Sequence, residues 1–186
     1  MSRKGKIFII SAPSGAGKGT VIERLLKIRP ELVFSVSATT RAARAREREG
    51  VAYYFVTREQ FLGMIKRDEF LEYAEYVGEL YGTPKKSIYD CVGKGIDVLL
   101  DIEVQGARQV KAKVPDAVMI FIVPPDMSEL ERRLRGRGTD SEEKLVARLE
   151  RARTELDEKK HYDHIVVNDC VSRAAEEILS IIDIAT

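Results

Sequence analysis

The stretch SAPSGAGKGT, residues 11–20, decides the fold that this sequence predicts. It follows the β-branched and aromatic run KIFIIS at 6–11, which indicates a buried strand, and it leads into the helical pattern TVIERLLKI at 20–28. A glycine-rich turn between a strand and a helix directs backbone N–H groups and the positive end of the helix dipole at one point. The stretch therefore predicts a phosphate-binding loop, with Lys18 as the cation for the outer phosphates.

The loop departs from the usual phosphate-loop pattern at two positions. Ala12 stands where the pattern has glycine, and Gly19 stands where it has the hydroxyl that coordinates Mg²⁺. Either Thr20 reaches the metal or the phosphates, or phosphate oxygens and waters hold most of the ion, which Mg²⁺ tolerates well. Asp101, at the end of the apolar run IDVLLD, is the natural acidic partner for the metal or its waters, although it could also be a simple strand-end cap. A turn that only lets the helix pack on the strand is the plainer alternative for the whole loop.

Outward from the loop, strand-like and helix-like segments alternate. Apolar runs at 96–103, 117–125 and 164–169 predict buried strands, and amphipathic segments between and after them predict helices. In the long charged helix the expected apolar stripe is Leu145, Leu149, Ala152 and Leu156. This alternation predicts an α/β fold with a parallel sheet flanked by helices.

The span from about residue 34 to 84 breaks the alternation and reads as an inserted lobe. We expect strand-like runs at 32–38 and 53–56, then a segment at 58–77 that mixes a helix with a possible strand near its end. A turn is expected at Gly82–Pro84, followed by a further helix.

Composition narrows the functional classes. Among 186 residues, 31 are Lys or Arg and 30 are Asp or Glu, a balance that argues against a general nucleic-acid binder. The sequence has no apolar run long enough for a membrane span, and its first apolar run leads straight into the glycine loop, unlike a signal peptide. Cys91 and Cys170 are best read as reduced thiols of a cytoplasmic protein.

The motifs taken in order carry a resemblance to a known family. They are SAPSGAGKGT, SVSATTRAAR, YYFV, FLEYAEYVGELYGT, LLDIEVQGA, RLRGRGTDSEE and IVVND. Together they resemble the guanylate kinase family over about residues 4–184. The resemblance implies a P-loop nucleoside monophosphate kinase fold that transfers the γ-phosphoryl group of ATP to GMP with Mg²⁺. It also implies a core (4–33, 85–135 and 160–184), a GMP-binding lobe (about 34–84) and a lid (about 136–159).

On the ATP side, the resemblance assigns the loop and three separate regions. Arg137 and Arg148 would contact the transferring phosphoryl group, Arg133 is a further candidate, and Asn168 would touch the adenine. Without the resemblance, Arg148 could equally be an exposed arginine on a charged helix. Asn168, at the end of a strand, could equally be a residue that forms a turn. The implied ATP-binding residues of the loop are Ser11, Ala12, Pro13, Ser14, Gly15, Ala16, Gly17, Lys18, Gly19 and Thr20.

On the GMP side, the resemblance assigns the phosphate to Arg41, Arg44, Tyr53 and Tyr81, with Arg41 also a catalytic residue. The residue types agree, because guanidinium forks suit a phosphate dianion and phenol groups can donate to it. A solvated basic loop is the alternative, since further arginines follow.

Guanine would be read by Ser37, Glu72, Thr83 and Glu103, with Asp101 beside them. A carboxylate at Glu72 can accept from both N1–H and the 2-amino group of guanine, whereas adenine presents a bare acceptor at N1. Taken alone, Glu72 on a helix-like segment would more often be a solvated charge. Many family members have DID where this chain has DIE at 101–103, so the longer Glu103 is expected to contact the base differently or through water.

The implied chemistry needs no general base, because the GMP phosphate is largely ionised at neutral pH. His161 and His164 are therefore expected to be structural or exposed, and their HxxH spacing is too sparse for a zinc site. Two alternatives remain at this point. One is another small P-loop kinase, acting on a ribose bisphosphate or a different monophosphate. The other is a phosphopeptide-binding module like those of scaffold proteins, which often lose the loop lysine that this chain keeps.

Overall fold

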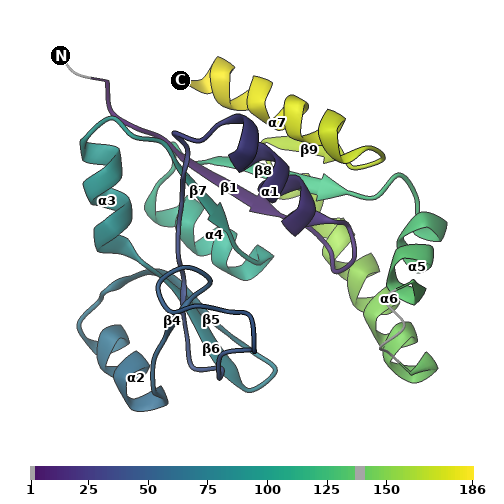
Figure 1. Ribbon diagram of the computed structural model, residues 1–186, viewed down its shortest axis with the longest axis horizontal. Coiled ribbons are helices and arrows are strands. Elements are labelled where there is room, and N and C mark those ends of the chain that lie inside the picture. Colours follow the sequence, from purple (N-terminus) through teal and green to yellow (C-terminus); the bar gives the residue numbers. More distant parts are fainter. Residues whose placement is uncertain (1–2, 137–140) are drawn as a thin grey trace.

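The protein is described by a computed structural model over residues 3–136 and 141–186. Its larger sheet is parallel throughout and has the strand order β2-β7-β1-β8-β9, of which β7, β1, β8 and β9 are labelled in Figure 1. The strands are β1 (Ile7–Ser11), β2 (Val33–Phe34), β7 (Val98–Asp101), β8 (Val118–Val123) and β9 (His164–Val167). The predicted parallel sheet flanked by helices is confirmed, and it places the phosphate loop at the carboxyl end of the central strand.

Strand β1 is the middle of the core because both of its faces are covered. Phe8 and Ile10 pack against helices α1 (Lys18–Ile28) and α7 (Val171–Ala185). Ile7 and Ile9 face the opposite way, towards α3 (Lys85–Gly93) and α4 (Val104–Lys113). A strand buried on both faces is apolar at every position, which explains the unbroken run IFII.

A second, smaller sheet has the order β4-β3-β6-β5 and packs against α2. Its own core is the stacked pair Phe61 and Phe70, with ring centroids 4.4 Å apart, together with Ala38 and Leu80. Thr57 begins α2 with a capping box that involves Gln60. The elements are β3 (Ala38–Thr39), β4 (Tyr54–Phe55), α2 (Arg58–Lys66), β5 (Phe70–Tyr76) and β6 (Glu79–Pro84).

Two local predictions are wrong in this region. The run 32–38 is not one strand, because β2 ends at Phe34 in the larger sheet and β3 starts at Ala38 in the smaller one. Gly82–Pro84 is not a turn but the end of β6. Gly82 stands in a strand because a Cβ there would lie 2.8 Å from Cδ1 of Phe70, so only glycine lets the aromatic pair pack so closely.

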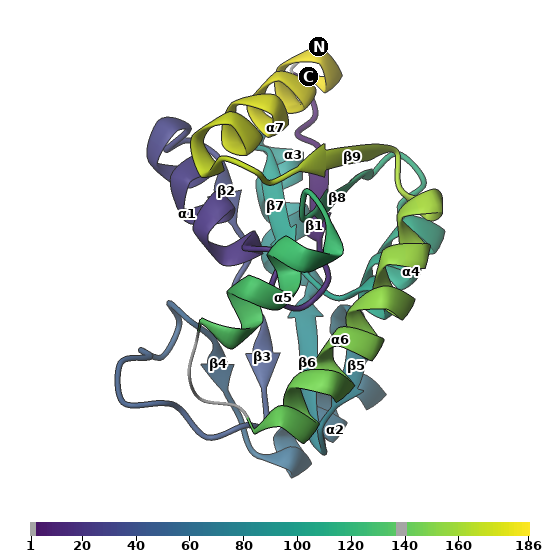
Figure 2. The same cartoon turned by 90° about the vertical axis from the view of Figure 1, so that its right-hand side faces the viewer.

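Helices α5 (Met127–Arg135) and α6 (Glu142–Asp157) face the viewer in Figure 2, in front of the two sheets, and the short η1 (Glu158–His161) follows α6. Asp126 and Ser141 cap α5 and α6, and Leu145 and Ala152 of the predicted stripe are buried against α5. The division into core, lobe and lid remains a prediction. Within the described ranges no helix is long and apolar enough to cross a membrane.

Candidate active site

The phosphate loop owes its shape to two glycines. Gly15 and Gly17 have φ values of 92° and 86°, in the left-handed region that side chains rarely adopt. A Cβ at Gly17 would also lie 2.5 Å from Nδ2 of Asn168. Gly17 is the N-cap of α1 and offers no side-chain cap, so the first amides of the helix remain available to an anion.

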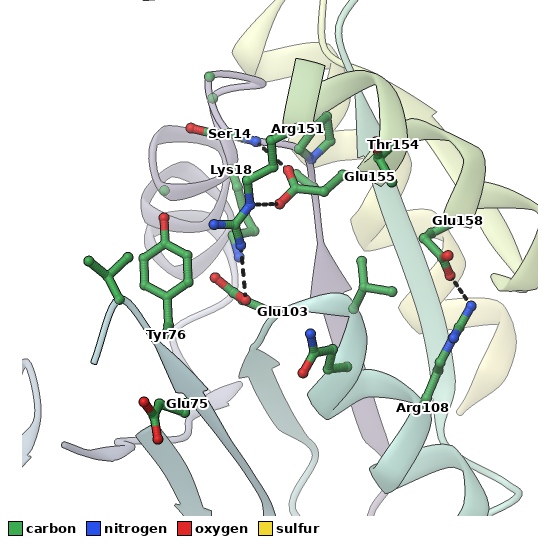
Figure 3. A pocket seen from close by; sticks show the side chains of 18 of the residues that line it. Ser14, Lys18, Glu75, Tyr76, Glu103, Arg108, Arg151, Thr154, Glu155 and Glu158 are labelled. Atoms are coloured by element: carbon green, nitrogen blue, oxygen red, sulfur yellow. Dashed lines mark hydrogen bonds and ion pairs between the residues drawn. The ribbon is translucent and has the colours of Figure 1, made fainter. Parts of the chain in front are cut away.

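This loop forms one wall of a pocket of about 900 Å³, shown in Figure 3. The loop residues that line it are Ala12, Pro13, Ser14, Gly15, Gly17, Lys18, Gly19 and Thr20. Ser11 and Ala16 do not line it, because both are fully buried beneath the loop. The Ser11 hydroxyl donates to the Ile102 carbonyl at 2.7 Å, so its side chain serves the core.

The side chain of Lys18 lies at the carboxyl end of β7. Its Nζ is 2.5 Å from Oδ1 of Asp101, which pairs in register with Ile10 of β1. The two predicted metal-side residues are not in one pocket, because Thr20 lines the larger pocket and Asp101 a smaller one. Among the described residues no cluster of three His, Cys, Asp or Glu side chains could hold a metal.

Helix α6 brings charged groups to the opposite wall. Arg148 donates from Nη2 to the Ser14 hydroxyl at 2.9 Å, so the predicted arginine does meet the loop. Glu155 accepts from the Ser14 backbone N–H at 3.1 Å, which places a carboxylate beside a backbone donor of the phosphate loop. Glu155 was missed by sequence reasoning, since it is one acid among many on a charged helix.

Arg151, also missed, joins α6 to the smaller sheet. Its Nε donates to Glu155 at 2.8 Å, and its Nη2 lies 3.6 Å from Oε2 of Glu103. Its guanidinium carbon lies 4.5 Å from the ring centroid of Tyr76, in cation–π contact. Figure 3 shows these side chains pointing into the same pocket from three elements.

Arg133 and Asn168 brace the loop from below. Asn168 is 2% exposed, and its side-chain amide donates to the Ala16 carbonyl at 2.7 Å. Arg133 donates to the Asn168 backbone carbonyl at 2.9 Å and is held by Glu129, whose pKa the side chains of Arg132 and Arg133 lower to about 2. Their contact with ATP stays a prediction, and Arg137 lies outside the described residues.

A second cavity of about 250 Å³ adjoins the first. It shares Lys18, Tyr76 and Glu103 with the larger pocket, so the two spaces meet at these side chains. The predicted residues that line it are Lys18, Ser37, Tyr53, Glu72, Tyr81, Asp101 and Glu103, joined by Ala74, Tyr76, Ile102 and Gly106. Residues from six separate segments thus converge on one small space.

Glu72 is the buried acid of this cavity. It lies on strand β5 and not on a helix, which corrects the helix-like reading of its segment. Only 5% of the residue is exposed, and burial raises the pKa of its carboxyl group to about 7. Thr83 is fully buried, donates its hydroxyl to Glu72, and does not itself line the cavity.

The predicted phosphate-binding side chains gather around Tyr53. The guanidinium carbon of Arg41 lies 5.4 Å from the centroid of the Tyr53 ring, and the ring of Tyr81 lies edge-on at 6.0 Å. Arg41 pairs with Glu47 at 2.8 Å, and the hydrogen bond from Arg41 lowers the pKa of Glu47. The Arg44 side chain is exposed, but its backbone N–H also donates to Glu47, an acid that sequence reasoning overlooked among arginines.

Glu103 stands just before α4, between the two pockets. Its side chain is 49% exposed and faces Arg151, and burial raises the pKa of its carboxyl group. Its contact with a base stays a prediction. His161 and His164 are exposed, one of the two expectations for them, and they line neither pocket.

The chain is similar to known proteins along nearly its whole length. The family model described as guanylate kinase matches residues 4–185. A guanylate kinase of Streptococcus agalactiae is 52% identical over 98% of this chain and 88% of its own. One of Synechococcus sp. is 50% identical over 94% of this chain and 81% of its own. The crystal structure of guanylate kinase from Anaplasma phagocytophilum superposes with a TM-score of 0.81 at 39% identity, covering 98% of this chain and 87% of that one.

Proposed function

The chain belongs to the guanylate kinase family and is a GMP phosphotransferase, and we propose that its two adjoining pockets bring the γ-phosphoryl group of ATP to GMP. The observation that carries this proposal is the junction of the pockets. The larger one has the phosphate loop as its wall, the smaller one has the buried acid Glu72, and Lys18 lines both. A phosphoryl group transferred between two nucleotides must cross such a junction.

In the smaller cavity, Glu72 is the group that would recognise guanine. When ionised, this carboxylate accepts from N1–H and from the 2-amino group, while the Thr83 hydroxyl holds it from behind. Adenine has no proton at N1, so it would leave the buried carboxylate without its donors, and such a loss discriminates by about 10⁴-fold. Ser37 lines the cavity and is the proposed donor to guanine O6.

The GMP phosphate is assigned to Arg41, Tyr53 and Tyr81, with Arg44 closing from the exposed side. The planar guanidinium of Arg41 and the two phenol groups provide donors at one corner of the lobe. Glu47 keeps Arg41 at that corner before the substrate arrives. We expect the incoming dianion to compete with Glu47 for the same guanidinium.

Transfer then depends on alignment and charge. The GMP oxygen attacks the γ-phosphorus and ADP leaves, with no proton to remove from an already ionised phosphate. Lys18 exchanges Asp101 for the phosphate oxygens, and Arg148 is the described arginine placed on the loop from α6. Arg137 keeps its proposed role, which rests on the family resemblance.

Mg²⁺ is proposed as the partner of ATP. Asp101, a carboxylate at the end of a parallel strand, and the Thr20 hydroxyl are the oxygen donors that would hold it, directly or through water. When bound, Mg²⁺ neutralises charge on the phosphates. One or two protein ligands suffice, since this ion usually keeps waters and substrate oxygens as its other ligands. We place the reaction in the cytoplasm, where the free thiols of Cys91 and Cys170 stay reduced.

A coupled ADP-release assay with ATP and a panel of GMP, AMP, UMP and dTMP tests the proposal. Rapid turnover with GMP alone is expected, and Glu72→Gln should raise the KM for GMP at least about 100-fold because one acceptor becomes a donor. Glu69→Gln, an exposed acid paired with Arg67, is the matched control and should leave the rates unchanged. Equal turnover of all four monophosphates would overturn the guanine-binding role of Glu72.

A further inference from the structure

Glu72 lies on the edge strand of the smaller sheet, so its position needs support from outside that sheet. The order β4-β3-β6-β5 leaves one side of β5 without a strand partner. Helix α4 of the core covers this side, because Gln109 donates to the Tyr73 carbonyl at 2.8 Å and accepts from its N–H at 3.3 Å. One side chain thus satisfies both backbone groups that a neighbouring strand would have taken.

The strand is also irregular just before Glu72. Phe70 pairs with Pro84 and Glu72 with Thr83, so Leu71 is an extra residue and the register shifts there. Such a bulge bends a strand and turns the following side chain. The Leu71 carbonyl is bound by Nζ of Lys113 at 2.7 Å, a second contact from α4.

The third contact is the close approach of Gly106, which has no side chain, to the carboxylate of Glu72. A Cβ built on Gly106 would lie 2.4 Å from Oε2 of Glu72 and 2.9 Å from its Cδ. Gly106 is in the first turn of α4, so the carboxylate lies against the amino end of this helix, where the helix dipole favours a negative charge. Only glycine leaves room for the carboxylate there.

Gly106, Gln109 and Lys113 are spaced three and four residues apart, which puts them on one face of α4. We propose that this face is a positioning surface for Glu72, with Gly106 as a specificity determinant for guanine. The inference rests on the proposed function for its substrate and on the contacts above for its geometry. Helix α4 begins directly after Asp101–Glu103. It therefore also fixes Glu72 relative to the carboxyl end of β7, where Asp101 pairs with Lys18.

Gly106→Ala is the direct test. An added methyl group has to displace the carboxylate, because the groups within 3 Å of it belong to the Glu72 side chain. The KM for GMP should rise at least about tenfold, the loss expected for hydrogen bonds to a charged group, with the KM for ATP unchanged. The preference for GMP over IMP, which lacks the 2-amino group, should fall with it. Gly93→Ala, at the end of α3 with open space around it, is the matched control.

A second variant guards against a merely structural effect. Gln109→Met keeps the length of the side chain and removes both bonds to Tyr73, and we expect about a threefold rise in the KM for GMP alone. An unchanged KM for GMP in Gly106→Ala, or an equal loss of ATP and GMP binding in both variants together with a lower Tm, would overturn the inference.

The geometry can be tested apart from the substrate. A ¹³C NMR titration of the Glu72 carboxyl group without nucleotide should give a lower pKa in Gly106→Ala, since the displaced group gains water. If the native chain shows no preference for GMP, the proposed function fails while this titration still decides the inference. An identical titration in both proteins would contradict it.

Discussion

The phosphate loop and the carboxylate of Glu72 are each proposed to bind one nucleotide, and they are built in opposite ways. The loop is ten consecutive residues between β1 and α1, shaped by the backbone of Gly15 and Gly17. Glu72 is held by Thr83 from the next strand and by α4, more than thirty residues further along the chain. The loop offers amide donors whose charge does not change with pH, whereas Glu72 offers an acid whose pKa is about 7.

The difference indicates which substitutions should impair the phosphate loop and which should impair the Glu72 site. The shape of the locally built loop comes mainly from its own glycines, with Asn168 and Arg133 as braces, so we expect changes in its own residues to affect it most. A site assembled from distant segments responds to packing, to pH and to the helix that supports it. Changes on the loop side should therefore affect catalysis most, and changes on the Glu72 side should affect affinity and stability.

The largest effect is expected from Lys18→Met. Removal of the only side chain cation that the loop itself supplies should lower kcat by about 10³-fold, the loss typical of a preorganised charge at the reacting group. Steady-state ADP release with saturating ATP and GMP measures this loss. Lys27→Met, which breaks an exposed pair with Glu23 on the same helix, is the control and should keep full activity. Retention of a tenth of the activity in Lys18→Met would contradict the assigned role.

The next effect is on stability and concerns Glu72→Gln. It tests the contrast between the loop amides, which do not titrate, and the carboxyl group of Glu72, which does. Folding raises the pKa of Glu72 from 4.5 to about 7, so its favourable contribution is complete below pH 4.5 and lost as the pH rises through 7. Glu72→Gln keeps the uncharged form, and at pH 8 it should raise the free energy of unfolding by up to about 3 kcal/mol. Thermal unfolding at several pH values from 5 to 8 should show a gain in Tm that disappears at the acidic end. A gain that is independent of pH, or a lower Tm at pH 8, would show that the carboxylate is not destabilised by burial.

The smallest effect is expected where α6 touches the smaller sheet. Arg151→Met removes the cation–π contact with Tyr76 and the ion pair with Glu103. Because the side chain is 42% exposed, we expect only about a threefold rise in the Kd for GMP. Isothermal titration with GMP in the presence of ADP measures the change. Arg153→Met, an exposed position on the same helix, should bind as the native chain does.

The same contrast explains what could be predicted from the sequence. The loop, its strand and its helix are contiguous, so SAPSGAGKGT predicts them together, and the parallel core follows from its alternating segments. The strand that carries Glu72 was obscured by the helical spacing of apolar residues in 58–77. Asp68, with a φ of 52°, lies between α2 and β5, and although Asp adopts positive φ more often than most residues, it does so too rarely to mark this chain reversal in advance.

Other site residues were hidden because their roles depend on contacts between distant segments. Glu47, Arg151 and Glu155 stand among many similar charges, and only the fold selects them for Arg41, Tyr76 and the Ser14 amide. Ser11 shows the opposite error, since a motif residue faces the core. The motif identified the loop, while the three-dimensional contacts decide which of its side chains are available to a ligand.

The central position of β1 has a consequence for how the chain opens. Every residue of this strand is buried, and it is paired on both sides, with β7 and with β8. We expect amides in such a strand to exchange with deuterium only when the whole domain unfolds, whereas the two-residue edge strand β4, which is only partly buried, should open locally. The phosphate loop is therefore attached to the segment expected to exchange most slowly, and local opening of the smaller sheet would release the nucleotide proposed for that side while the anchor of the other stays folded.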